Sequence, residues 1–84
     1  MIRLYKIKEC PRCERLADFL TIYQIDFTEE PLDAAAATEY LCSTGLPALA
    51  APLLQVEENW FGPDQLFIDE ELDVCSLQSI LGMV

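Results

Sequence analysis

Hydrophobic and polar positions divide the first part of the chain into short segments with two different periods. Residues 1–7 are mostly apolar and β-forming, which predicts a buried strand. From Pro11 to about Tyr23 the apolar residues recur at helical spacing, and a proline suits the first helical position because no backbone N–H is needed there. Apolar and polar residues then alternate from Ile25 to Glu29, which predicts a second strand ended by Pro31.

The rest of the chain is predicted to hold a further helix, a pair of strands and a closing helix. Asp33 is a good N-cap for an alanine-rich helix that ends near Gly45. The later elements are expected as a strand at Leu53–Val56, a turn at Glu58-Asn59, a short strand at Trp60-Phe61, a helical turn at Asp64–Phe67 and a helix from Asp73.

This order, β-α-β-α-β-β-α, predicts an α/β sandwich. A right-handed crossover makes the first two strands parallel. The 84 residues are expected to form one domain, residues 1–84. With 52% hydrophobic residues the chain has enough apolar side chains for one core, which argues against disorder.

Basic charge is confined to the start of the chain. The five basic residues all lie in the first fifteen positions: Arg3, Lys6, Lys8, Arg12 and Arg15. Thirteen of the fifteen acidic residues follow them, and the net charge is −10. Such an acidic body argues against binding to nucleic acid or to an anionic membrane surface. The alternative is that the basic residues only solubilise the first strand.

No apolar run approaches the roughly 18 residues of a membrane span. Charged residues interrupt the apolar stretch at the N-terminus, so we expect no signal peptide and a cytoplasmic location. Structural disulfides are rare in that compartment.

Two cysteines, Cys10 and Cys13, lie between the first strand and the first helix. This spacing at a helix start is typical of a pair that closes into a disulfide and reopens. Cys10 is expected as the N-cap, where the helix dipole, Lys8 and Arg12 would lower its pKa into the range of roughly 3.5–7.5. Cys13 lies one turn inside and should be more buried. Cys10 would attack a target disulfide, and Cys13 would resolve the mixed disulfide.

Half of a metal site is the competing interpretation of the cysteine pair. A tetrahedral zinc site needs two more ligands at compatible spacing. The chain has no histidine, and its other cysteines, Cys42 and Cys75, stand alone. We therefore expect no metal, and we expect Cys42 and Cys75 to be buried, inert thiols.

Two proline motifs are candidates for substrate binding. A cis peptide bond before Pro52 would turn the edge of the third strand toward the Cys10 sulfur, where the backbone of Ala51 could pair with an extended substrate. Pro47 is the competing position for such a proline. Gly62-Pro63-Asp64 is expected to place a helix start beside the same cleft, or simply to end the strand pair.

Taken together, these motifs resemble the glutaredoxin family of thioredoxin-fold proteins over essentially the whole chain. The resemblance rests on four features: Cys10-Pro11-Arg12-Cys13 after a strand, the predicted strand Ile25–Glu29, Ala51-Pro52-Leu53, and Gly62-Pro63-Asp64 nine residues after Leu53. It implies a thioredoxin-like fold, with a four-stranded mixed sheet flanked by helices. It also implies a cis bond before Pro52, Cys10 as the nucleophile and Cys13 as the resolving thiol.

The resemblance supports glutathione binding less well than it supports the fold and the cysteine roles. The family usually has a tyrosine or similar residue where Arg12 stands and commonly a second glycine where Pro63 stands. Its glutathione-binding members usually hold the glycyl carboxylate with basic residues, one of them in the second helix. The second helix here offers only Asp33 and Glu39 as charged groups.

The leading hypothesis is a thiol–disulfide oxidoreductase that acts on a protein disulfide. It would work as a monomer with no bound cofactor, and either a reductase or glutathione would recycle it. The alternatives are a glutathione-dependent reductase or deglutathionylase, and a non-enzymatic module that senses redox state or binds metal.

Overall fold

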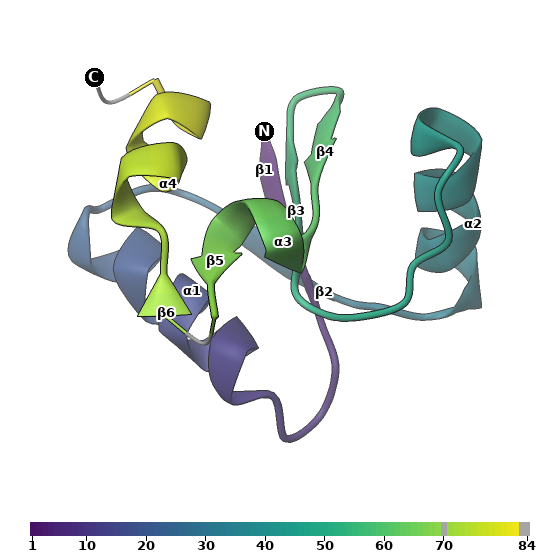
Figure 1. Ribbon diagram of the computed structural model, residues 1–84, viewed down its shortest axis with the longest axis horizontal. Coiled ribbons are helices and arrows are strands. Elements are labelled where there is room, and N and C mark those ends of the chain that lie inside the picture. Colours follow the sequence, from purple (N-terminus) through teal and green to yellow (C-terminus); the bar gives the residue numbers. More distant parts are fainter. Residues whose placement is uncertain (70, 83–84) are drawn as a thin grey trace.

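The computed structural model describes residues 1–69 and 71–82, which form a mixed sheet with helices on both faces (Figure 1). In chain order the elements are β1 (Ile2–Lys6), α1 (Pro11–Ile22), β2 (Thr28–Pro31), α2 (Ala34–Thr44), β3 (Leu53–Val56), β4 (Asn59–Phe61), α3 (Pro63–Leu66), β5 (Phe67–Ile68), β6 (Glu71–Leu72) and α4 (Val74–Ile80).

The main sheet has the strand order β2-β1-β3-β4. Strand β1 runs parallel to β2 and antiparallel to β3, and β4 pairs antiparallel with β3. The predicted four-stranded mixed sheet and the parallel first pair are therefore confirmed.

Alternate residues of the central strands β1 and β3 belong to two separate hydrophobic cores, one on each face of the sheet. Leu4 lies opposite Leu54 and Tyr5 opposite Leu53 in the β1–β3 ladder. Because successive strand side chains point to opposite faces, Leu4 and Leu54 join the core beneath α1 and α4, whereas Tyr5 and Leu53 join the core beneath α2. Figure 1 shows these helices on the two sides of the sheet.

Side-chain caps and a glycine set the helix ends where the sequence predicts them. The carboxylate of Asp33 accepts a hydrogen bond from the backbone N–H of Ala36 at 2.9 Å, and Asp73 caps α4 in the same way. Gly45 ends α2 in the left-handed region at φ 75°, and its N–H donates to the carbonyl of Leu41 at 2.8 Å. A residue with a side chain adopts that φ only at a cost.

The predicted second strand is displaced toward the C-terminus. The ladder with β1 begins at Thr28, opposite Arg3, and extends to Pro31, so the expected start at Ile25 is wrong. Ile25 and Phe27 are half-buried and pack against the core from the connection before the strand. Their alternation with polar residues therefore comes from this packing. Pro31 is tolerated at the end of β2 because β2 is an edge strand.

One small element was not predicted. Strands β5 and β6 pair antiparallel between α3 and α4, with Phe67 opposite Leu72. Two-residue strands are too short to show a period in the sequence.

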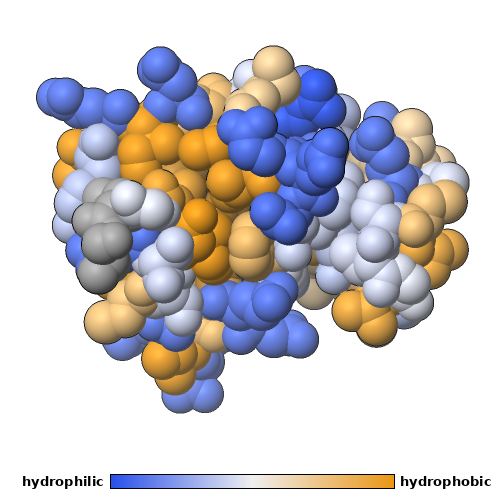
Figure 2. Space-filling view, turned by 90° about the horizontal axis from the view of Figure 1, so that it is seen from above, coloured by the Kyte–Doolittle hydropathy of each residue, from blue (hydrophilic) through white to orange (hydrophobic). Residues whose placement is uncertain are grey.

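The face that carries the N-terminus and the β3–β4 turn shows hydrophobic residues bordered by hydrophilic ones (Figure 2). This face lies at the opposite end of the sheet from the β1–α1 loop (Figure 1), so the cysteine pair is not on it.

Candidate redox site

The two cysteines of the Cys-x-x-Cys motif are joined by a disulfide at the start of α1. Their Cα atoms are 5.2 Å apart, within the range that a disulfide requires. Cys10 is the N-cap, as predicted, with extended backbone angles of φ −114° and ψ 98°. The backbone N–H of Cys13 donates to the Cys10 sulfur at 3.1 Å. The first turn of α1 thus points a peptide dipole at that sulfur.

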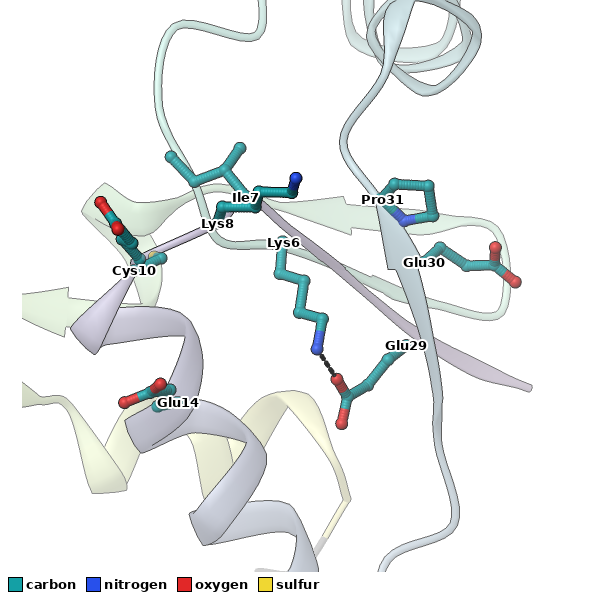
Figure 3. A pocket seen from close by; sticks show the side chains of 9 residues that line it. Lys6, Ile7, Lys8, Cys10, Glu14, Glu29, Glu30 and Pro31 are labelled. Carbon is teal, nitrogen blue, oxygen red and sulfur yellow. Dashed lines mark hydrogen bonds and ion pairs between the residues drawn. The ribbon is translucent and has the colours of Figure 1, made fainter.

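The two cysteines differ in their exposure to solvent. Cys13 is 2% exposed and Cys10 is 9% exposed, which confirms the expected order of burial. Cys10 also lines an open cavity of about 470 Å³, whereas Cys13 does not. This cavity lies between the end of β1, the edge strand β2 and the start of α1 (Figure 3). A partner can therefore approach the pair at Cys10.

The side chains of Lys8 and Arg12, predicted to support Cys10, point to different places. Lys8 lines the cavity together with Cys10, but Figure 3 shows its nitrogen on the side of Pro31. The guanidinium of Arg12 lies over the ring of Phe67, with its carbon 5.8 Å from the ring centre. Pro11 is exposed and occupies the first position of α1.

Carboxylates outnumber ammonium groups in the cavity beside Cys10. Lys6 is one of the two lysines there, and it is held by an ion pair with Glu29 across the cavity (Figure 3). Three further acids share the walls: Glu9, Glu14 and Glu30.

The segment just before β3 packs against the disulfide. Ala51 is 3% exposed and forms one buried cluster with Cys10 and Cys13, against which Leu32 packs. The Ala51-Pro52 peptide bond is cis, so the predicted proline is Pro52 and not Pro47.

The remaining predicted binding residues lie elsewhere. Gly62 and Asp64 line a second cavity together with the loop 46–50, and Cys10 is not among its walls. The structure thus packs Ala51 against the cysteine pair, with Pro52 next along the chain, and assigns Gly62 and Asp64 to a different cavity.

Cys42 and Cys75 are exposed, so the prediction that both are buried is wrong. On α2 the buried residues are Ala36 and Tyr40, and on α4 the buried residue is Leu77. A residue two positions from a buried one points to the opposite side of a helix. Cys42 follows Tyr40 by two and Cys75 precedes Leu77 by two, which places both thiols on the solvent faces.

Phe67 and Leu32 were not singled out in the sequence. Phe67 contacts Arg12, one of the two residues between the cysteines, and Leu32 packs against the pair, but both contacts join segments far apart in the chain. Only the tertiary structure reveals them.

Residues 1–69 and 71–82 contain no group of three or more His, Cys, Asp or Glu side chains that could hold a metal ion. No helix in this part of the chain is long and apolar enough to cross a bilayer.

Solved structures share the architecture of this chain, although no protein-family model and no curated protein sequence matches it. A crystal structure of a variant of the thioredoxin-like protein BC3987 aligns with a TM-score of 0.72 and 20% sequence identity, covering 99% of this chain and 96% of that one. The parent BC3987 structure gives 0.70 and 20%, covering 95% and 99%. The glutaredoxin grx-1 from Archaeoglobus fulgidus gives 0.68 and 16%, covering 95% and 84%. The predicted thioredoxin-like α/β fold is confirmed.

Proposed function

We propose that this protein is a thiol–disulfide oxidoreductase that exchanges the Cys10–Cys13 dithiol with a disulfide of another protein. The observation that carries the proposal is the asymmetry of the pair. Cys10 lines an open cavity and accepts an N–H at the start of α1, whereas Cys13 is buried behind it. The accessible sulfur is thus also the one whose thiolate the backbone stabilises.

The reaction follows from this geometry in two steps. The Cys10 thiolate attacks one sulfur of the target disulfide, the target S–S bond breaks, and the departing target thiolate takes a proton from solvent. Cys13 then loses its proton and attacks the Cys10 sulfur, which releases the second target thiolate. Two electrons pass from the dithiol to the target, and the Cys10–Cys13 bridge seen in the structure is the oxidised product.

A protein disulfide suits the surroundings better than a glutathione disulfide does. The cavity beside Cys10 has four carboxylates, and one of its two lysines is paired with Glu29. A ligand of net negative charge is repelled there, although salt weakens this effect beyond roughly 8–10 Å. An extended protein segment need not carry that charge, and we expect it to pair with the backbone beside Pro52, next to the disulfide.

The test is to trap the mixed disulfide. The Cys13→Ser variant, reduced and mixed with insulin, should accumulate a covalent adduct on Cys10, because the resolving thiol is lost. Mass spectrometry under non-reducing conditions measures it. The matched control is Cys10→Ser, which should form little adduct because Cys13 is only 2% exposed.

Recycling of the oxidised wild-type protein identifies the electron donor. Thioredoxin reductase and reduced glutathione are compared as the sole reductant. Full turnover of protein disulfides by Cys13→Ser would contradict the two-cysteine mechanism, and turnover only with glutathione would favour the glutathione-dependent alternative.

A further inference from the structure

We propose that Glu9 is a positioning residue for the nucleophile, and that its left-handed backbone rather than its carboxylate orients the Cys10 sulfur. Glu9 has a φ of 54°, a conformation that residues with a Cβ adopt only at a cost. Such conformations persist where the surrounding structure imposes them, and they are concentrated at functional sites. The inference rests on the proposed function, because it assigns a further residue to the reaction of that cysteine.

Four non-glycine residues have a positive φ within residues 1–69 and 71–82, and three of them lie at turns away from the cysteine pair. Gln24 follows the end of α1, Glu57 lies in the turn between β3 and β4, and Asp69 follows β5. Glu9 differs from these three because it directly precedes the N-cap of α1, which is the accessible cysteine. The backbone cost at Glu9 is therefore placed next to the reactive sulfur.

The chain is anchored on both sides of Glu9. On one side the carbonyl of Lys6 accepts the N–H of Leu32 at 2.8 Å, which holds the end of β1 to the segment after β2. On the other side the carbonyl of Cys10 accepts the N–H of Glu14 at 3.1 Å, which makes Cys10 part of the first turn of α1. The chain turns between these two anchors, where Glu9 has its positive φ.

The backbone angles at Glu9 decide where the Cys10 side chain points. The Cys10 sulfur accepts the N–H of Cys13 at 3.1 Å, and Cys10 also lines the open cavity. Moving Glu9 to the right-handed region would rotate the chain by roughly 120° about its N–Cα bond. Because β1 is held in the sheet, that rotation would displace the Cys10 sulfur from both the N–H and the cavity. The left-handed turn thus keeps the sulfur stabilised and accessible at once.

Two substitutions at position 9 remove the same carboxylate but differ in their tolerance of a positive φ. Asparagine adopts the left-handed region readily, whereas valine, with its branched Cβ, is an outlier there. In the reduced protein, iodoacetamide at pH 6.5 should therefore modify Cys10 roughly tenfold faster in Glu9→Asn than in Glu9→Val, which corresponds to a difference of about one in the pKa of the thiol. Each rate is divided by that of the exposed Cys42 in the same sample.

The same pair of substitutions at Gln24 controls for strain at any left-handed turn. Gln24 has a φ of 57° after the end of α1, so Gln24→Val should lower stability relative to Gln24→Asn and leave the relative rate of Cys10 unchanged. Glu9→Ala, which has an unbranched Cβ, should give an intermediate rate and keeps the test available if Glu9→Val does not fold. Equal rates of Cys10 in all folded Glu9 variants would overturn the proposal, because the two anchors alone would then position the sulfur.

Reduction of insulin separates this proposal from the exchange activity. If the protein exchanges disulfides, reduced Glu9→Asn should also reduce insulin faster than reduced Glu9→Val. If no variant reduces insulin but the alkylation rates keep the expected order, the proposed function fails and the positioning role stands. Equal alkylation rates together with normal reduction of insulin would refute the positioning role alone.

Discussion

The guanidinium of Arg12 lies over the ring of Phe67, with its carbon 5.8 Å from the ring centre. Arg12 stands between the two cysteines, and Phe67 ends α3 and begins β5. The contact therefore ties the start of α1 to a segment more than fifty residues later in the chain.

Removing this cation should destabilise the folded protein. Arg12→Met keeps much of the aliphatic length but loses the attraction of the cation to the ring, so the free energy of unfolding should fall by about 1 kcal/mol. Denaturant titration measures it, with Lys8→Met as the control for loss of an exposed positive charge. In a Phe67→Leu background the same Arg12 substitution should cost less, and an equal cost in both backgrounds would show that the contact contributes nothing.

Cys10 should be the fastest of the four thiols in the reduced protein. The N–H of Cys13 and the start of α1 stabilise its thiolate, so iodoacetamide near pH 6.5 should modify Cys10 far faster than Cys13. Peptide mapping by mass spectrometry gives each rate, with the exposed Cys42 and Cys75 as internal references for ordinary thiols. Equal rates at Cys10 and Cys42 would argue against an activated nucleophile.

Cys42 and Cys75 should react without unfolding. Both are exposed on helix faces turned away from the cores, whereas Cys10 and Cys13 are bridged in the oxidised protein. A thiol reagent added to the native oxidised protein should therefore modify both residues. Modification only after denaturation would restore the sequence-based expectation that they are buried.

The cap of α2 should contribute measurably to stability. Asp33→Ala removes the acceptor for the N–H of Ala36, and such losses cost about 1 kcal/mol. Thermal or denaturant unfolding measures the change. Asp26→Ala removes an exposed acid from a connection and should change stability by less than about 0.5 kcal/mol. Equal effects of the two substitutions would mean that the cap is dispensable.

The sequence alone determined the order of the helices and of the four strands of the main sheet, and the position of the disulfide. Helix caps, glycine stops and apolar periods are local properties, so Asp33, Gly45 and the cysteine spacing located α2 and the start of α1 correctly. The alternation of apolar and polar residues gave a wrong prediction at Ile25 and Phe27, where packing against the core produces the same pattern as a strand. The sequence also showed no sign of strands β5 and β6, because two residues are too few to show an alternation.

Tertiary structure alone decided what surrounds each reactive group. A helix has one buried face, and only the packed sheet fixed that face on Tyr40 and Leu77, leaving Cys42 and Cys75 in solvent. The contact of Arg12 with Phe67, and the placing of Gly62 and Asp64 in a cavity that Cys10 does not line, arise from the folded path of distant segments. Local sequence preferences carry no information about such long-range contacts, because they depend on how the sheet and helices close on one another.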